Sequence, residues 1–218
     1  MNLQQAKAVG YTPVFERNRA SEARTLINVG GSGSSKSHSI AQLLIEKFLT
    51  ESDKAIIVSR KTMPALRRSA YALVVGLLKE YGAYDYINHN KTDNVLFYKD
   101  NAMWFFGLDE PSKAKSLAGG ASYIWLEEAD EFSFDDYLAF GLQLRRQTSK
   151  EKNQIFLTFN PIDGNGWIPT KLIKQENTEV IHSTIKDNPF AEPEYVKALE
   201  QMAGGDDNYY RVYVLGEW

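Results

Sequence analysis

The stretch that most constrains the fold lies near the amino end, at residues 25–39, and reads TLINVGGSGSSKSHS. A short apolar run ends in Gly30 and Gly31, and a glycine-serine loop then leads to Lys36 and Ser37. A helical pattern begins directly afterwards, at Ile40. A strand, a glycine-rich loop and a helix in this order are typical of a phosphate-binding P-loop, in which backbone N–H groups turn inward around phosphate oxygens.

The P-loop pattern is broken at one position. In G-x-x-x-x-G-K-[ST], Gly30 provides the first glycine, but Ser35 stands where the second is expected. Serine approaches a phosphate almost as closely as glycine, although its φ angle is less free. The same letters also suit a simple glycine-serine turn before a helix, because serine is a good N-cap. The rest of the chain has to separate these two interpretations.

The composition excludes several classes of protein. With 218 residues, 43% of them hydrophobic, the chain is long enough for an α/β domain with a full core. It contains no cysteine, which excludes disulfides and cysteine-based zinc sites. No stretch approaches the roughly 18 apolar residues of a membrane span, and the polar first residues do not resemble a secretion signal. The net charge of −3 means that any contact with DNA has to use a local basic patch.

Apolar strands alternate with helical patterns along the remainder of the chain. Strands are expected at 25–29, 54–59, 122–126, 154–159 and 179–183, a hairpin at 95–98 and 102–106, and helices at 37–48, 63–80, 134–146, 194–202 and 208–214. In the helix at 134–146, we expect Leu138, Leu142 and Leu144 to face inward. The alternation predicts an α/β fold with a mostly parallel central sheet flanked by helices.

The strand at 122–126 ends in a pair of acids, Glu127 and Glu128. A P-loop ATPase needs one acid that holds Mg²⁺ opposite the Ser37 hydroxyl, and another that orients and deprotonates the attacking water. We assign Glu127 to the metal and Glu128 to the water. Paired acids are also suited to the positive end of a following helix. Together with a P-loop upstream, however, the pair favours ATP hydrolysis.

Two other strand ends carry polar side chains. Arg60 follows the strand at 54–59, at the edge where open α/β sheets bind ligands, so it is a candidate to contact nucleotide; a solvated charge is the alternative. Thr158 and Asn160 lie at the end of the strand at 154–159, where they could report hydrolysis to the rest of the protein, although an Asn-Pro turn alone also explains them. At least one additional strand lies between the P-loop and the acids, as in P-loop enzymes that use a catalytic glutamate.

Taken in order, these motifs resemble the large terminase subunit of tailed phages and prophages, the DNA-packaging motor. The resemblance runs nearly the length of the chain and rests on GGSGSSKS, VSRKTMPALRRS, FFGLDEPSKAKSLAGG, YIWLEEADEFS, LTFNP, STIKDNPF and YYRVYVLGEW. It implies a P-loop NTPase of the additional-strand, catalytic-glutamate type that uses ATP and Mg²⁺. It also implies an ATPase core with an N-terminal arm at 1–164 and a small lid or linker subdomain at 165–218. The family's RNase H-like nuclease domain is absent from this segment, so we expect no nuclease activity.

The residue patterns and the resemblance together assign roles by position. Nucleotide contacts fall on Gly31, Ser32, Gly33, Ser34, Ser35, Lys36, Ser37, His38 and Arg60; catalysis on Glu128 and Lys36; the metal on Ser37 and Glu127; coupling on Thr158 and Asn160. Many relatives have an arginine, considered a finger on the phosphates, where this chain has Ser32. The alternative fingers are Lys113, Lys115, Arg60, Arg145 and Arg146. Because a missing finger lowers the rate by ~10³ or more, we expect the isolated chain to be a weak ATPase.

The implied activity is ATP hydrolysis that translocates double-stranded DNA into a procapsid, in the cytoplasm of an infected bacterium. The implied partners are DNA gripped without sequence readout, a portal protein, a small terminase subunit, and copies of this chain in a ring, with a monomer as an alternative when isolated. Lys150, Lys152 and the Arg67-Arg68 pair are candidates for the grip. Two other functions stay open: a nucleotide-dependent assembly or scaffold module with little hydrolysis, and a small-molecule P-loop kinase, which the catalytic glutamate disfavours.

Overall fold

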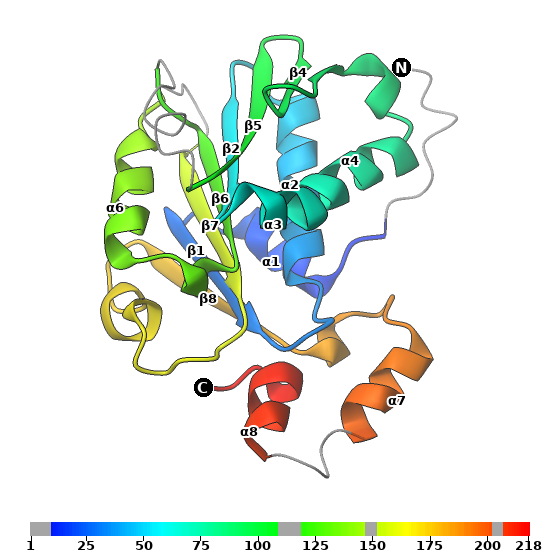
Figure 1. The fold of residues 1–218 in the computed structure, drawn as a ribbon, viewed down its shortest axis with the longest axis vertical. Helices are drawn as coiled ribbons and strands as arrows, with labels where there is room; N and C mark the ends of the chain where they lie inside the picture. The colour runs from blue at the N-terminus through cyan, green and yellow to red at the C-terminus, as the bar shows by residue number, and fades with distance from the viewer. Residues whose placement is uncertain (1–9, 109–118, 147–151, 202–206) are drawn as a thin grey trace.

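The computed structural model describes residues 10–108, 119–146, 152–201 and 207–218, and its centre is one eight-stranded sheet (Figure 1). The strands are β1 (Thr25–Gly30), β2 (Ala55–Arg60), β3 (Asn88–Asn90), β4 (Val95–Tyr98), β5 (Asn101–Gly107), β6 (Tyr123–Glu127), β7 (Gln154–Phe159) and β8 (Thr178–Ser183). Their order in the sheet is β3-β4-β5-β2-β6-β7-β1-β8. All neighbours pair parallel except β3 with β4 and β4 with β5, which confirms the mostly parallel α/β fold and the expected hairpin.

Helices cover both faces of the sheet. The α-helices within the described residues are α1 (Pro13–Ala20), α2 (Lys36–Thr50), α3 (Met63–Arg68), α4 (Ala70–Glu80), α6 (Phe134–Gln143), α7 (Pro193–Gln201) and α8 (Asp207–Tyr210). Side chains alternate along the central strands, so Leu26 of β1 packs with α1, α2 and α4, whereas Ile27 packs with α6. The central strands are therefore buried on both faces, as their continuous apolar runs indicate.

One strand separates the P-loop strand from the acidic strand. It is β7, which pairs parallel with β1 on one side and with β6 on the other. This strand follows the acids in the sequence, so the extra strand in the sheet is not one of those that lie between the two motifs along the chain. As a result, the carboxyl ends of β1, β7 and β6 lie next to one another at one edge of the sheet.

The helix expected at 63–80 is in fact two helices. α3 and α4 meet at Ser69, whose φ of −114° and ψ of −105° are not helical. The reason lies outside the helices, because the Ser69 hydroxyl donates a hydrogen bond to the carboxylate of Glu127 at the end of β6. Helical periodicity cannot reveal a break that a distant side chain stabilises.

The inward face of α6 also differs from the expectation. Leu138 and Leu142 are 46% and 74% exposed, and only Leu144, just after the helix, is buried as expected. Tyr137 and Phe140 fill the core instead, packing with Phe132, Phe106 and other rings. The large aromatic side chains thus decide which side of α6 faces the sheet.

The carboxyl-terminal part contributes both to the sheet and to a group of helices beside it. β8 pairs along its length with β1, so a division at residue 164 separates two neighbouring strands of one sheet. The helices α7 and α8 lie beyond the end of the sheet at which β1 leads into α2 (Figure 1). The helix expected at 208–214 is α8 followed by a π-helical turn, Arg211–Leu215. Within the described ranges, no helix has the length and apolar character needed to cross a membrane.

Candidate active site at the carboxyl edge of the sheet

The loop between β1 and α2 has the tight curvature of a P-loop. Gly33 and Ser35 have φ angles of +71° and +66°, in the left-handed region that favours glycine. For a serine this backbone costs about 1 kcal/mol. The Ser35 hydroxyl donates to the Thr12 hydroxyl at 3.2 Å, and the Thr12 and Ser39 hydroxyls lie 2.8 Å apart. The segment before α1 therefore supports the residue that departs from the P-loop pattern.

Lys36 begins α2 and is almost fully buried, with 8% of its surface exposed. Its ammonium donates hydrogen bonds to the carbonyls of Gly30, at 2.9 Å, and Gly31, at 2.7 Å, and to the Ser34 hydroxyl at 3.2 Å. Burial lowers the pKa of Lys36 to about 8, and the nearby charge of Glu128 partly offsets this. The lysine is thus held at the centre of the loop, beside an acid from β6.

The two acids at the end of β6 have different surroundings. Glu127 is buried, and one of its carboxylate oxygens accepts hydrogen bonds from the Ser69 hydroxyl and, at 3.3 Å, from the Ala70 N–H. Burial raises the pKa of Glu127, although the bond from Ser69, the charge of Arg60 and the bond from Ala70 act in the opposite direction. The break between α3 and α4 therefore provides the donors that fix this carboxylate.

Glu128 is placed by a sharp turn of the backbone. Its φ of +50° and ψ of +58° end β6 abruptly and bring its side chain to the same cavity as Lys36. Burial, followed by the charges of Asp130 and Glu127, raises the pKa of Glu128 to about 7, while Arg60 and Lys36 act to lower it. A carboxylate with a pKa near neutrality is suited to accept a proton in catalysis.

A cavity of about 400 Å³, here called the P-loop cavity, joins these residues. It is lined by Ser32, Gly33, Ser34, Ser35, Lys36, Ser37, His38, Glu128, Thr158, Phe159, Asn160 and Tyr195. The structure thus brings together most of the site residues named from the sequence, including both members of the coupling pair. Thr158 is buried, and its hydroxyl accepts a hydrogen bond from the Trp125 indole at 2.9 Å.

Several basic candidates lie elsewhere. Arg60 lies beside the acids but pairs through two nitrogens with Glu131, at 3.2 and 3.3 Å, rather than lining the P-loop cavity. Arg146 pairs with Asp53, near the amino ends of the strands, and neighbouring Arg145 packs against Gly120. Within one chain, these two arginines are therefore at the opposite edge of the sheet from Lys36. The remaining finger candidates, Lys113 and Lys115, lie outside the described residues.

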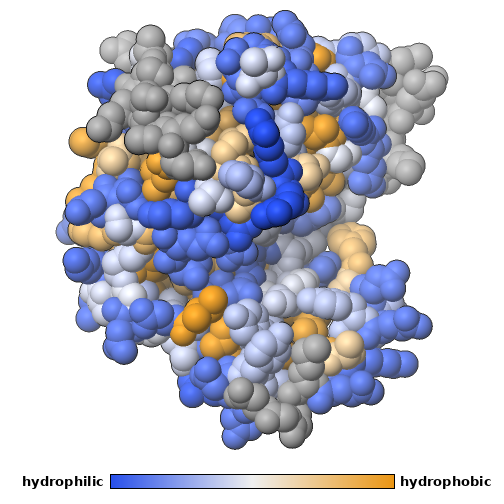
Figure 2. Space-filling model, viewed as in Figure 1, coloured by the Kyte–Doolittle hydropathy of each residue, from blue (hydrophilic) through white to orange (hydrophobic). Residues whose placement is uncertain are grey.

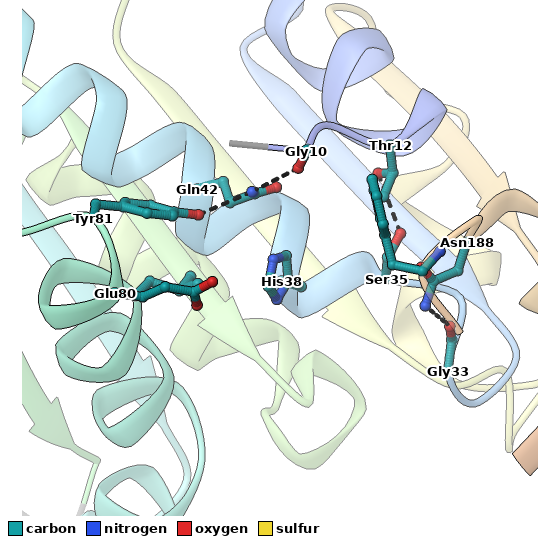
Figure 3. Close-up of a pocket in the computed structure, with 11 residues that line it drawn as sticks. Gly10, Thr12, Gly33, Ser35, His38, Gln42, Glu80, Tyr81 and Asn188 are labelled. Atoms are coloured by element: carbon teal, nitrogen blue, oxygen red, sulfur yellow. Dashed lines mark hydrogen bonds between the residues drawn. The ribbon is translucent and has the colours of Figure 1, made fainter. Parts of the chain in front are cut away.

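A second cavity, of about 580 Å³, adjoins the P-loop cavity and shares Gly33, Ser35 and His38 with it. It is lined as well by Gly10, Thr12, Gln42, Leu77, Glu80, Tyr81, Asn188 and Phe190. Figure 3 shows Gln42 between Tyr81 and Gly10, with His38 facing Glu80 across the cavity. In the space-filling view, a notch separates the upper part of the molecule from the part that holds α7 and α8 (Figure 2).

Gln42 is a buried polar side chain that lines the second cavity. It is 4% exposed, and its amide nitrogen donates to the Tyr81 hydroxyl at 3.0 Å and to the Gly10 carbonyl at 3.1 Å. Its amide oxygen is buried and has no hydrogen-bond partner within the described residues. A buried acceptor without a partner costs free energy.

Sequence reasoning missed the residues that support the site from a distance. Thr12, Gln42 and Ser69 have no motif of their own, and their roles depend on contacts across 23 to 58 residues of chain. Asn188 and Phe190 did have a signal, because they belong to the stretch STIKDNPF that contributed to the family resemblance. No chemical role followed from those letters until the fold placed them beside the P-loop.

Comparisons with known proteins agree with this geometry. The family model for the phage terminase large subunit matches residues 22–217. The PBSX phage terminase large subunit of Bacillus subtilis is 28% identical over 212 residues, which cover 87% of this chain and 48% of that protein. The chain thus spans about half the length of the curated relatives it matches.

Solved structures share the fold at lower identity. The large terminase of a thermophilic bacteriophage, in complex with ADP, superposes with a TM-score of 0.75 at 18% identity, covering 95% of this chain and 54% of that one. The ATPase domain of the large terminase from Thermus phage P74-26 gives 0.71 at 13% identity, covering 94% and 92%. The match of the family model over nearly the whole chain shows that it belongs to the phage terminase large subunit family.

Proposed function

We propose that this chain is the ATPase motor part of a DNA-packaging terminase, which hydrolyses ATP to translocate double-stranded DNA into a procapsid. The observation that carries the proposal is the P-loop cavity, where the P-loop lysine and Glu128 from another strand line one space. A phosphate-binding lysine and a proton acceptor on one cavity are what hydrolysis of a phosphoanhydride requires.

The two adjoining cavities together suit a nucleoside triphosphate. The phosphates would lie in the P-loop cavity, where the Lys36 ammonium would exchange the loop carbonyls for phosphate oxygens. The base would lie in the second cavity, where the exposed Glu80 carboxylate is an acceptor complementary to the exocyclic amine of adenine. The large terminase of the thermophilic bacteriophage, which shares this fold, was crystallised in complex with ADP.

Mg²⁺ fits the donor set of the site. Ser37 and Glu128 line the P-loop cavity, and Glu127 directly precedes Glu128 at the end of β6, so hard oxygen ligands of the kind that a magnesium ion prefers are available on these elements. In the described part of the chain, no three His, Cys, Asp or Glu side chains come together as a metal site, so phosphate oxygens and water would complete the shell. A bound Mg²⁺ would neutralise charge on the phosphates. We propose Ser37 and Glu127 as its protein ligands.

Glu128 is the proposed general base. Its pKa of about 7 leaves a large fraction ionised at neutral pH while keeping its affinity for a proton high. Thr158 and Asn160 line the P-loop cavity from the end of β7, and the Thr158 hydroxyl accepts a hydrogen bond from the Trp125 indole of β6. We propose that this pair transmits hydrolysis through β7.

Translocation of DNA into a procapsid requires other molecules besides this chain. We propose double-stranded DNA, a portal protein, a small terminase subunit and a homo-oligomeric ring, acting in the cytoplasm of the infected host. Because Arg145 and Arg146 lie at the other edge of the sheet from the P-loop, a finger drawn from this pair would have to come from a neighbouring subunit. The lid at 165–218 and the lack of nuclease activity remain predictions.

The test compares wild type with Glu128→Gln in ATP hydrolysis and in binding of a nonhydrolysable ATP analogue. We expect the variant to lose hydrolysis by about 10² to 10⁴-fold, the usual contribution of a general base, while its binding stays intact. If ATP binds but neither protein hydrolyses it, the motor proposal fails for this chain and a nucleotide-dependent assembly module takes its place.

A further inference from the structure

The segment that follows β8 touches the P-loop directly. The Asn188 amide nitrogen donates a hydrogen bond to the Gly33 carbonyl at 2.8 Å, and the Ser32 N–H donates to the Tyr213 carbonyl at 2.6 Å. A side chain at Gly33 would have no room, since a Cβ there would lie 2.6 Å from Ile185. The helices beyond the sheet are therefore in contact with the loop that is proposed to bind phosphate.

Phe190, like Asn188, lines the second cavity. Its ring packs on Gly10, where an added Cβ would lie 2.4 Å from the ring's Cζ atom. The ring therefore approaches the backbone at Gly10 more closely than a larger residue there would allow. The ring is nonetheless 62% exposed. An aromatic face that remains exposed beside a cavity is suited to stack on a flat ligand.

Asn188 fixes the position of that ring. Both polar atoms of its side-chain amide form hydrogen bonds. The nitrogen donates to the Gly33 carbonyl, and the oxygen accepts from the Phe190 N–H at 3.1 Å. The backbone N–H of Asn188 is itself bonded to the Ile185 carbonyl at 3.1 Å. One asparagine thus connects the P-loop to Phe190.

We propose that Phe190 is the stacking wall for the nucleotide base, and that Asn188 is the residue that positions it. The inference rests on the proposed nucleotide site and adds that the base, not only the phosphates, is bound partly by the segment after β8. A nucleotide then bridges two parts of the chain: the P-loop and α2 on one side, and the segment leading into α7 on the other. Base binding and the placement of that segment are consequently coupled.

The experiment measures binding of two probes, ADP and inorganic tripolyphosphate, each with Mg²⁺. ADP reports the base and the phosphates together, whereas tripolyphosphate reports the phosphates alone. The test variant is Phe190→Ala, and Tyr86→Ala is the matched control because Tyr86 is a comparably exposed aromatic, at 61%, that belongs to neither cavity. Thermal unfolding of each variant shows that it is folded.

Phe190→Ala is expected to weaken ADP binding about tenfold or more, the usual loss when a stacking ring is removed, and to leave tripolyphosphate binding unchanged. Asn188→Ala should weaken ADP relative to tripolyphosphate by a smaller factor, about threefold, as expected for one hydrogen bond. Tyr86→Ala should bind both probes as wild type does.

A second readout follows hydrogen exchange over residues 188–201. ADP should slow exchange there in wild type and not in Phe190→Ala. The inference is overturned if Phe190→Ala binds ADP as tightly as wild type, or if it weakens both probes equally. If wild type itself binds neither probe, the proposed nucleotide site fails, which is a different result from losing the base contact alone.

Discussion

Both edges of the central sheet carry lysines and acids, but these charged groups have different surroundings at the two edges. At the carboxyl edge, Lys36 is buried with a lowered pKa, and burial raises the pKa values of Glu127, Glu128 and Asp130. Ser35 and Glu128 also hold left-handed backbone angles there. Like charges, burial and backbone strain all reduce the stability of this edge.

At the amino edge, several charged and polar side chains are paired with one another. Glu51 accepts hydrogen bonds from the Tyr123 hydroxyl at 2.7 Å and from Lys47 at 3.2 Å, and Lys54 lies 3.9 Å from it. The Asn101 amide donates to two carbonyls at the end of α2. Lys47 also lies over the ring of Tyr123, 4.5 Å from its centroid. This edge stabilises the fold, and the contrast supports the proposed active site at the other edge.

The largest expected difference between the edges comes from two lysines on the same helix. Lys36→Ala should weaken binding of ADP with Mg²⁺ by about 100-fold, since two hydrogen bonds to charged oxygens contribute about 1.5 kcal/mol each. Lys47→Ala, at the other end of α2, should leave ADP binding unchanged and lower the free energy of unfolding by about 1 kcal/mol. Calorimetric titration measures the ADP affinity of both variants, and urea unfolding measures their stability. A loss of ADP affinity in Lys47→Ala would contradict the difference expected between the two edges.

The next effect concerns stability and carries a definite sign with pH. The pKa of Glu128 is about 7 in the folded chain, well above that of an unfolded glutamate, so its ionisation destabilises the fold. The penalty is full above pH 7, declines as pH falls toward the unfolded value and is absent below it. Glu128→Gln should therefore raise the free energy of unfolding by about 1–2 kcal/mol at pH 8, with the gain vanishing toward pH 4.

Urea unfolding at pH 8, 6 and 4 measures this gain. Glu200→Gln serves as the control, because Glu200 is an exposed acid on α7 and its amide should change stability little at any pH. If Glu128→Gln is no more stable than wild type at pH 8, then the crowded carboxyl edge is not strained by that charge.

The smallest effect is expected at Ser35. Ser35→Gly relieves a left-handed backbone that costs a serine about 1 kcal/mol, but it removes the hydrogen bond to Thr12 and adds freedom to the unfolded chain. These contributions nearly cancel, so the free energy of unfolding should change by less than about 1 kcal/mol. A loss of more than about 2 kcal/mol would show that the serine hydroxyl, rather than the backbone geometry, holds the loop.

The edge that carries the proposed active site was also the easier one to predict from the sequence. The P-loop and the acids at the end of β6 are local patterns, in which apolar strands lead into residues with special backbone or charge requirements. Their positions therefore follow from the strands themselves. Ser35 shows the limit of this reasoning, since the letters suggested a doubtful P-loop and only the contact with Thr12 explains how a serine is held there.

The features that escaped prediction depend on distant partners. The break between α3 and α4 lies at Ser69, whose hydroxyl donates a hydrogen bond to Glu127, 58 residues later. The spacing of apolar residues in the sequence carries no information about that hydrogen bond. In α6, leucines at helical spacing were expected to face inward, but the aromatic side chains of Tyr137 and Phe140 occupy the core and leave Leu138 exposed. Packing volume outweighs the spacing of equally apolar residues.

The most direct test of the central claim is the pH dependence of kcat/KM for ATP hydrolysis, measured with Mg²⁺ in excess. This quantity follows the ionisation of the free enzyme. Glu128 has to be ionised to accept a proton and Lys36 has to be protonated to bind phosphate, so the groups with pKa values of about 7 and about 8 predict a bell-shaped profile with its maximum between pH 7 and pH 8. A profile that stays level from pH 6 to pH 9 would contradict the claim that these two residues carry the reaction.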